Sequence, residues 1–345
     1  MVRKILDCHD SRSESRNDQS KRIVSGIRPT GKSHLGNYFG ALQNWVELQK
    51  QNDCFFFIAD WHALTTDYQN SSELSKNIEE LVLDLLSCGL NPKKSTFFIQ
   101  SHIKEHSELF LLLSMITPVG WLERNPTYKD QIQELSAKDI TNLGFLGYPV
   151  LQAADILIYQ GEAVPVGRDQ LPYLEVCREI ARRANHLYGN IFKEPQPILT
   201  QSPLIQGTDG RKMSKSYNNA IYLSDSEEDF KKKIITFITD PKRQRRTDPG
   251  DPKDCPAFQN FHKRFMNQEE QAEIYKGCTT ASIGCVDCKT KLYHNIHPWI
   301  FPIREERKRL SKDRKSLYTV LEEGAQKARK IASKTMEIVR AAFHL

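Results

Sequence analysis

Residues 21–37 read KRIVSGIRPTGKSHLGN, and this stretch sets the start of the fold. Its first eight residues, Lys21–Arg28, carry three apolar side chains, which predicts a strand. The Pro29–Gly31 turn follows it. A helix is expected from about Gly36 to Gln51, because apolar side chains recur there at helical spacing. The stretch therefore predicts a strand that passes through a tight turn into a helix.

Two further apolar runs continue the same pattern. Cys54–Ala59 (CFFFIA) and Ser95–Ser101 (STFFIQS) are short and almost continuously apolar, which is typical of parallel strands covered on both faces. A helix is expected between them, with Ser72 as its N-cap residue and Gly89 just past its end. Strands that alternate with helices predict an α/β fold, here a doubly wound parallel Rossmann-type domain.

Beyond the third strand the pattern changes. Residues 106–190 are expected to be mainly helical, and Pro172 suits the first turn of one helix. Residues 198–204 are expected to return the chain to the sheet, and the charged sequence after Tyr217 predicts further helices. We therefore expect a mobile polar tail (1–20), a catalytic α/β domain with a helical insertion (21–216) and a mainly helical C-terminal domain (217–345).

The overall composition is that of an ordinary soluble protein. Hydrophobic residues make up 39% and charged residues 27%, and there is no apolar run of about 18 residues that would predict a transmembrane helix. The first 20 residues lack the apolar core of a secretory signal and contain acids that mitochondrial presequences avoid. We expect a cytoplasmic protein, in which the eight cysteines do not form disulfides.

The net charge of +6 is compatible with a polyanionic partner but does not establish one. Basic residues are concentrated between Lys231 and Arg246, where seven of 16 residues are Lys or Arg. A solvated helix face and an RNA-facing patch explain this concentration about equally well.

The turn after the first strand is the expected nucleotide site, because doubly wound sheets bind ligands beyond the carboxyl ends of their strands. His34 and Asn37 lie three residues apart at a helix start, so both can donate to phosphate oxygens. Gly36 carries no side chain and allows the adenine to approach closely. Alone this motif is weak, since a His and an Asn at a helix start are more often caps.

A second motif lies far downstream. Lys212–Ser216 reads KMSKS and follows Asp209–Gly210. Two lysines on a glycine-flanked loop can follow a polyphosphate and tighten on it as charge builds in the transition state. A solvated basic turn is the alternative, and the presence of the first motif disfavours it.

These two motifs resemble the signature pair of the class I aminoacyl-tRNA synthetases: residues 34–37 resemble the HIGH motif, and residues 212–216 match KMSKS throughout. Three stretches resemble the tryptophanyl branch, namely SGIRPTG (25–31), YPVLQAADIL (148–157) and VPVGRDQ (164–170). The resemblance runs from about residue 21 to residue 345. A tyrosyl-tRNA synthetase is one alternative, which fits the last two stretches less well. A paralogue that binds RNA without aminoacylating is the other, and it predicts a damaged motif.

The resemblance implies how tryptophan is bound. An indole needs an apolar slot and one acceptor for its N–H, because an unpaired buried group costs roughly 1–3 kcal/mol. The resemblance assigns that acceptor to Asp155; a helix Asp in a salt bridge is the alternative, which the apolar neighbours of Asp155 disfavour. The other residues implied to contact tryptophan are Val24, Gly26, Gln152 and Val166 around the slot, with Tyr148 and Gln170 at the ammonium group.

The resemblance also implies the ATP site and the partners. His34, Asn37, Lys212 and Lys215 are the implied catalytic residues, with Mg²⁺ held mainly by the phosphates of ATP. The residues implied to bind ATP are Arg28, Pro29, Thr30, Gly36, Asn37, Gly167, Arg168, Asp169, Leu204, Lys212, Met213, Ser214, Lys215 and Ser216. Arg28 and Arg168 depart from the usual Gln and Glu of the branch, and Gln152 from its common Met. The implied partners are tRNA(Trp) and a second copy of the chain.

Four cysteines form a cluster in the last third of the sequence. Cys255, Cys278, Cys285 and Cys288 have the spacing C-x22-C-x6-C-x2-C. Thiolates gathered in a reducing compartment indicate a metal, and tetrahedral thiolate ligation suits zinc or an iron–sulfur cluster. Four unrelated thiols are the alternative. The same spacing resembles that of a subset of bacterial tryptophanyl-tRNA synthetases, which implies a [4Fe–4S] cluster, with zinc as the second choice.

Overall fold

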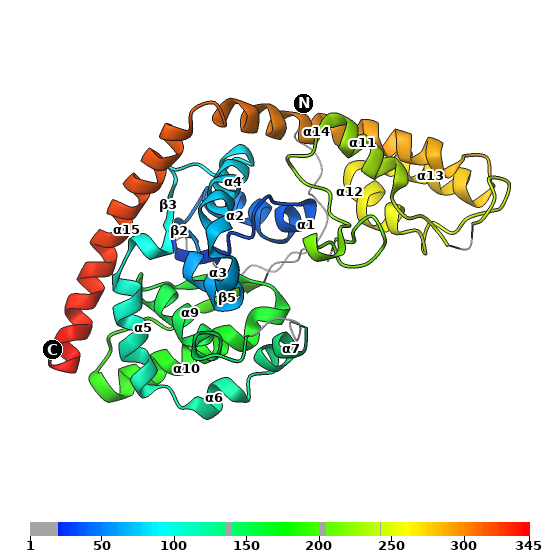
Figure 1. Ribbon diagram of the computed structural model, residues 1–345. Coiled ribbons are helices and arrows are strands. Elements are labelled where there is room, and N and C mark those ends of the chain that lie inside the picture. The colour runs from blue at the N-terminus through cyan, green and yellow to red at the C-terminus, as the bar shows by residue number, and fades with distance from the viewer. Residues whose placement is uncertain (1–19, 135–139, 200–204, 242) are drawn as a thin grey trace, which may run out of the picture.

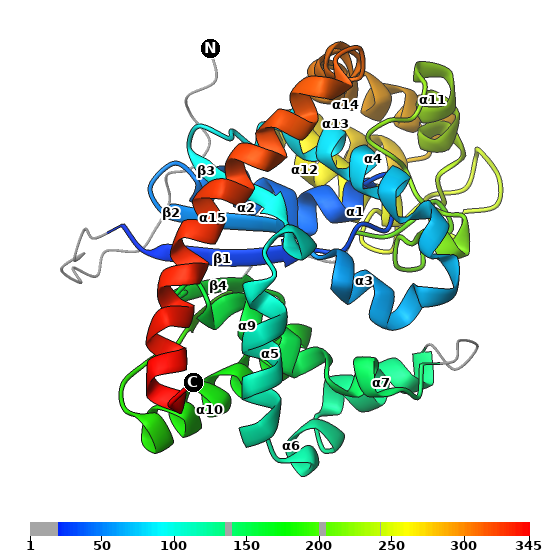
Figure 2. The same ribbon diagram turned by 60° about the vertical axis from the view of Figure 1, so that its left-hand side comes forward.

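The computed structural model describes residues 20–134, 140–199, 205–241 and 243–345. It contains one parallel sheet with the strand order β3-β2-β1-β4-β5, which confirms the doubly wound fold (Figures 1 and 2). The strands are β1 (Arg22–Ile27), β2 (Asp53–Ile58), β3 (Ser95–Ile99), β4 (Ala163–Val166) and β5 (Gln196–Leu199). The predicted tail lies outside the described residues.

Helices cover both faces of this sheet and predominate in the C-terminal region (Figure 1). The α-helices are α1 (Leu35–Asn37), α2 (Gln43–Leu48), α3 (Asp60–Asp67), α4 (Leu74–Ser87), α5 (Glu105–Ile116), α6 (Val119–Glu123), α7 (Pro126–Glu134), α8 (Leu143–Leu146), α9 (Tyr148–Leu157), α10 (Leu171–Tyr188), α11 (Glu227–Thr236), α12 (Lys263–Phe265), α13 (Gln268–Thr279), α14 (Cys285–Leu310) and α15 (Arg314–Phe343). The 3-10 and π segments are η1 (Tyr38–Leu42), η2 (Tyr68–Glu73), η3 (Gln100–His102), η4 (Arg168–Gln170), η5 (Lys215–Tyr217) and η6 (Phe258–His262).

Two local predictions differ from the structure. Ser72 does not cap a helix: it lies inside η2, and α4 begins only at Leu74, without a side-chain cap. The region 106–190 is mainly helical as predicted, but it also contains β4. This strand has only four residues, which are too few for a periodic pattern to reveal it. It pairs with β1 on one side and with β5 on the other, and so joins β5 to the rest of the sheet.

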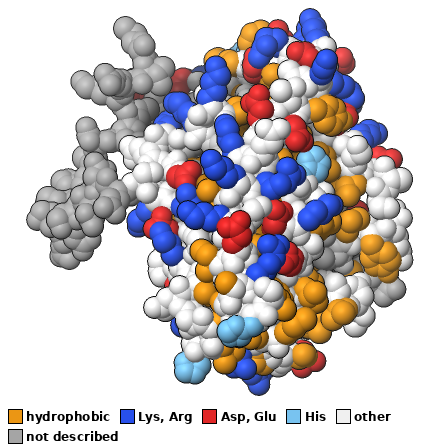
Figure 3. Space-filling view, turned by 90° about the vertical axis from the view of Figure 1, so that its left-hand side faces the viewer, with side chains coloured by type: hydrophobic (Ala, Val, Ile, Leu, Met, Phe, Trp, Pro, Cys, Tyr) orange, Lys and Arg blue, Asp and Glu red, His pale blue; other side chains and the backbone are white. Residues whose placement is uncertain are grey.

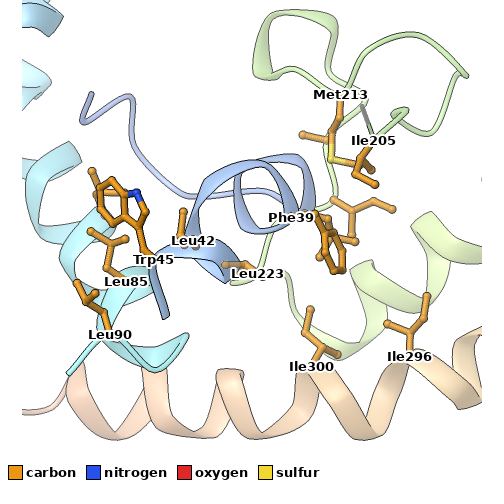
Figure 4. Close-up of a cluster of buried hydrophobic side chains, with 14 of the residues drawn as sticks. Phe39, Leu42, Trp45, Leu85, Leu90, Ile205, Met213, Leu223, Ile296 and Ile300 are labelled. Carbon is orange, nitrogen blue, oxygen red and sulfur yellow. The ribbon is translucent and has the colours of Figure 1, made fainter. Parts of the chain in front are cut away.

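A single hydrophobic core joins the α/β part of the chain to the helical region (Figure 4). Phe39 of η1, Trp45 of α2, and Ile296 and Ile300 of α14 contribute to this core. Met213 contributes from residues 212–216, the KMSKS loop. Buried residues on both sides of residue 216 thus pack into one cluster, so the proposed domain boundary does not separate two cores.

The long helix α15 packs across β3, the edge strand of the sheet (Figure 2). Gly324 permits this approach, because a Cβ there would overlap the carbonyl oxygen of Phe97. On the molecular face that includes the outer side of α15, acidic and basic side chains are interspersed (Figure 3). Within the described residues, no helix has the length and apolar character needed to cross a membrane.

Candidate functional site

A cavity of about 210 Å³ lies beside the carboxyl ends of β1 and β4. Among its lining residues are six of the seven predicted tryptophan contacts: Gly26, Tyr148, Gln152, Asp155, Val166 and Gln170. Val24 is fully buried next to Gly161 and is not among the described lining residues. Gly26 is required by packing as well, since a Cβ there would overlap the ring of Phe57. The sequence prediction therefore brought together residues that do surround one cavity.

Asp155 is the acidic residue among the described residues that line this cavity, and it is 1% exposed. His106 Nδ1 lies 2.5 Å from Oδ1 and His62 Nε2 lies 2.8 Å from Oδ2, while Gln100 Nε2 donates to both oxygens at 2.8 Å. Burial acts to raise the pKa of Asp155, but the neighbouring His106 and His62 hold it below its usual value. Asp155 is thus a buried acceptor whose carboxylate is paired with two buried histidines.

The partners of Asp155 continue into a chain of hydrogen bonds. The hydroxyl of Tyr159, which is fully buried, lies 2.6 Å from His106 Nε2. His106 thus bridges the two groups, with Nδ1 toward the Asp155 carboxylate and Nε2 toward the Tyr159 hydroxyl. His62 lines the cavity, and its buried Nδ1 has no hydrogen-bond partner among the described residues.

Sequence reasoning missed His62, Gln100, His106 and Tyr159. A signal was available for two of them: His62 follows β2 and Gln100 follows β3 directly, at the strand ends where doubly wound sheets bind ligands. His106 and Tyr159 gave no comparable signal, because each lies within a helix or at its end and reaches Asp155 only through the packing of α5 against α9.

His34 and Asn37 form a reciprocal cap at the start of α1. The Asn37 amide donates to His34 Nδ1 at 3.2 Å, and Asn37 Oδ1 accepts the His34 amide at 3.0 Å. Burial and then the charge of Lys215 lower the pKa of His34 to about 4, so its ring is neutral at physiological pH. Since Nδ1 accepts, the ring proton is on Nε2. The cap and the functional interpretation are therefore compatible, but His34 offers a hydrogen bond and not a positive charge.

The KMSKS loop lies against the phosphate turn, which we define as residues 29–37. The Lys215 ammonium donates to the carbonyl oxygen of Thr30, and Met213 packs near Gly36. A Cβ at Gly36 would lie 2.9 Å from His34 Nδ1, so this glycine also makes room for the histidine. The loop brings Lys215, which was predicted from the sequence alone, to the turn that carries His34.

Asn219 holds this loop and was not predicted. It is 2% exposed; its Oδ1 accepts the Ser214 amide at 2.8 Å, and its Nδ2 donates to Asp209 and to the carbonyl oxygen of Lys212. The side chain of Ser214 in turn accepts the Ser216 amide. The hydrogen bonds of the buried Asn219 side chain thus hold the backbone of the KMSKS loop in place.

Other predicted ATP contacts border the same region. Arg28 lines the cavity that contains Asp155 and a second, smaller cavity, and its Nη1 donates to Thr66 Oγ1 at 3.1 Å. Gly167 leaves space for the Asp169 carboxylate, which accepts the Gln170 amide at 2.9 Å. Leu204 lies outside the described residues.

The four clustered cysteines come together at the N-terminal end of α14. Burial and then the charges of Cys255, Cys278 and Cys285 raise the pKa of Cys288 to about 12, so these three thiols lie within electrostatic reach of Cys288. Cys288 Sγ lies 3.1 Å from His262 Nε2. Within the described part of the chain, however, no three His, Cys, Asp or Glu side chains are arranged to hold a metal ion.

Part of the basic stretch has a structural role. Arg243 is 9% exposed and donates to the carbonyl oxygens of Arg246 and Ile283, and Lys233 pairs with Asp225 at 2.7 Å. The exposed members include Lys232, Arg245 and Arg246. The whole stretch is therefore neither a solvated helix face nor an RNA-facing patch. Only its exposed residues are accessible to RNA.

The chain is similar to known proteins over most of its length. The family model of tRNA synthetases class I (W and Y) matches residues 16–298. The tryptophan–tRNA ligase of Thermotoga maritima is 53% identical, covering 94% of this chain and 99% of its own. The enzyme of Aquifex aeolicus is 47% identical, covering 94% and 100%. The structure of Campylobacter jejuni tryptophanyl-tRNA synthetase, complexed with ADP and tryptophan, has a TM-score of 0.85 at 36% identity, covering 94% and 100%.

The matches extend over nearly the whole chain, and they do not favour the tyrosine enzyme or the non-aminoacylating paralogue. The chain therefore belongs to the class I aminoacyl-tRNA synthetases, in the tryptophanyl branch, and it attaches tryptophan to its tRNA at the expense of ATP.

Proposed function

We propose that tryptophan binds in the cavity with its indole N–H on Asp155 and its ammonium group near Tyr148 and Gln170. The observation that carries this assignment is the buried, ionised carboxylate at the base of an otherwise mainly apolar cavity. ATP–pyrophosphate exchange with tryptophan and tyrosine in turn tests it. Tryptophan alone should support exchange, and the exchange should depend on Asp155; exchange with tyrosine would overturn the assignment.

The first step is the attack of the tryptophan carboxylate on the α-phosphate of ATP, which gives tryptophanyl-adenylate and pyrophosphate. We assign His34 Nε2 and the side-chain N–H₂ of Asn37 as hydrogen-bond donors to the phosphates. Lys212 and Lys215 supply positive charge as the pyrophosphate leaves. Mg²⁺ that accompanies ATP neutralises phosphate charge. Catalysis is therefore mainly positioning and charge stabilisation.

In the second step the 2′-hydroxyl of the terminal adenosine of tRNA(Trp) attacks the activated carbonyl and releases AMP. We propose that residues 21–216 carry both steps and that residues 217–345 meet the anticodon. The exposed basic residues Lys232, Arg245 and Arg246 are suited to contact the RNA backbone.

We propose that the four cysteines hold a [4Fe–4S] cluster. The donor chemistry fits: these are thiols that would remain reduced in a cytoplasmic protein, Arg243 Nη1 lies 3.8 Å from Cys278 Sγ, and the buried Lys289 is close by. Ligation requires the thiols to close on the cluster, since they are not arranged as a ligand set in the structure. Such a group would tie the 240–255 loop to α13 and α14.

Protein purified without oxygen should be brown and contain about four iron atoms per chain, as expected for one such cluster. Cys285→Ser should lower the visible absorbance and the iron content at least severalfold, because one of four ligands is lost. Cys88→Ser is the matched control, since Cys88 lies at the end of α4 and outside the cluster. A colourless protein with one zinc per chain would establish the alternative metal, and one without any metal would contradict both.

We further propose a homodimer that buries an apolar surface on α5, α6 and α8. Leu111 and Met115 lie one turn apart on α5 and are 54% and 68% exposed. Val119 of α6 is 55% exposed and Leu143 of α8 is 82% exposed. Gly147, which follows α8, lies against the ring of Phe110, so α8 adjoins α5. Exposed apolar side chains gathered in this way mark protein interfaces.

Met115→Glu should shift the chain from dimer to monomer at micromolar concentration in light scattering. The reason is that a charge buried without a partner weakens an interface by several kcal/mol. Ile338→Glu on α15, where the side chain is 47% exposed, is the control and should leave the mass unchanged. A wild-type chain that is monomeric at the same concentration would refute the proposal.

A further inference from the structure

Ser33, the residue before His34, has both of its backbone polar groups held from outside the phosphate turn. Its amide donates to Asp84 Oδ2 at 2.6 Å, and its carbonyl oxygen accepts the Leu223 amide at 3.0 Å. The Leu35 amide also donates to the carbonyl oxygen of Ile221. The position of the His34 backbone therefore depends on α4 and on the segment after the KMSKS loop.

Asp84 is held in turn by an arginine of α14. It is fully buried, and Arg307 Nε donates to Oδ1 at 2.6 Å while Arg307 Nη2 donates to Glu80 at 2.5 Å. The Arg307 side chain is only 15% exposed. A buried carboxylate is costly unless it is paired, so this guanidinium is what allows Asp84 to accept the Ser33 amide.

Leu223 is held by a second arginine of the same helix. Arg304 Nε donates to the carbonyl oxygen of Leu223 at 3.2 Å, and its Nη1 pairs with Glu227 at 3.0 Å. The Arg304 side chain is 12% exposed, and its guanidinium lies 4.3 Å from the centre of the Phe230 ring. Thus each polar group of the Ser33 backbone is linked, through one intermediate, to α14.

The two arginines act from one face of one helix. They lie three residues apart, which places them side by side. Ile296 and Ile300, further back on α14, are fully buried and point into the core that also contains Phe39 and Leu223 (Figure 4). Core packing therefore fixes α14, and α14 then fixes the turn.

We propose that Arg304 and Arg307 are positioning residues for ATP, which hold the Ser33–His34 backbone from α14 in the geometry that presents His34 Nε2 to the phosphates. This inference rests on the role proposed for His34. It assigns to the C-terminal helical region a part in adenylate formation that is separate from any contact with tRNA.

The test is a double-mutant cycle in ATP–pyrophosphate exchange. Arg307→Met, which keeps an apolar stem, should raise the KM for ATP about tenfold, as loss of a charge-assisted hydrogen bond does, with the KM for tryptophan within about twofold of wild type. In a His34→Ala background the same substitution should change kcat/KM for ATP by less than about twofold, because the effect proposed for Arg307 is transmitted to ATP by the His34 backbone.

Arg309→Met is the matched control: Arg309 lies on the same helix, is 69% exposed and pairs only with the neighbouring Glu306 among the residues described. It should behave as wild type. If Arg307→Met does not fold, Arg307→Lys replaces it in the test. Lysine keeps the charge but reaches only one of the two carboxylates, so the KM for ATP should rise by a smaller factor. A full tenfold loss in both backgrounds would overturn the inference. Wild-type kinetics of His34→Ala would instead overturn the role that the proposed function gives to His34.

Discussion

Asp155→Asn should lower kcat/KM for tryptophan by about 100- to 1000-fold in pyrophosphate exchange. The substitution replaces an acceptor by a group whose amide N–H₂ faces the donors of His62, His106 or Gln100. At least one buried donor and the indole N–H then lose their partners, at roughly 1–3 kcal/mol each. Steady-state exchange with varied tryptophan measures the effect.

Asp60→Asn is the control for this variant. Asp60 is also buried at the same sheet edge and accepts the Ser101 amide at 3.0 Å, a bond that asparagine can keep. A substrate analogue sharpens the test: an alanine that bears benzothiophene in place of indole has no N–H. The wild type should discriminate against this analogue and Asp155→Asn should not. Equal discrimination by both proteins would show that the indole N–H binds elsewhere.

Lys215→Ala should lower kcat of exchange by about 100- to 1000-fold and leave the KM for tryptophan near the wild-type value. The ammonium lies at the phosphate turn, next to His34, and not in the tryptophan cavity. Its charge is therefore used when negative charge develops on the leaving pyrophosphate, and removal of one such group typically costs this much.

Burial lowers the pKa of Lys215, while Asp84 and Glu80 act to raise it. Lys232→Ala, which removes an exposed lysine of α11, is the control for the change in net charge. Single-turnover measurement of adenylate formation separates chemistry from product release. An unchanged rate of adenylate formation in Lys215→Ala would remove this residue from the catalytic set.

The sequence predicted the parts of the site that lie close together along the chain. The strand–turn–helix of residues 21–37 and the KMSKS loop are local patterns; the first forms β1, a turn and α1, and the second lies against that turn. The tertiary partners of these motifs were not predictable in the same way. Asp84 and Arg307 lie more than 200 residues apart and neither belongs to a motif, so only the packing of α4 against α14 joins them.

Protonation is the second quantity that the sequence left open. His34 was expected to stabilise charge, but burial and Lys215 make it neutral. Asp155 was expected to meet one indole N–H, and the structure adds three side-chain partners from three different elements. Both results depend on desolvation and on neighbours far away in sequence, which no local spacing records.

The packing of α15 across β3 has a consequence for the order of synthesis. Roughly 200 residues separate the strand from the helix, so a ribosome working at about 5–20 residues per second needs on the order of 10–40 s to make the covering helix. During that interval the nascent chain carries an open sheet edge of the kind that recruits other strands. The β3 edge of the α/β part therefore gains its cover only after α15 has been synthesised.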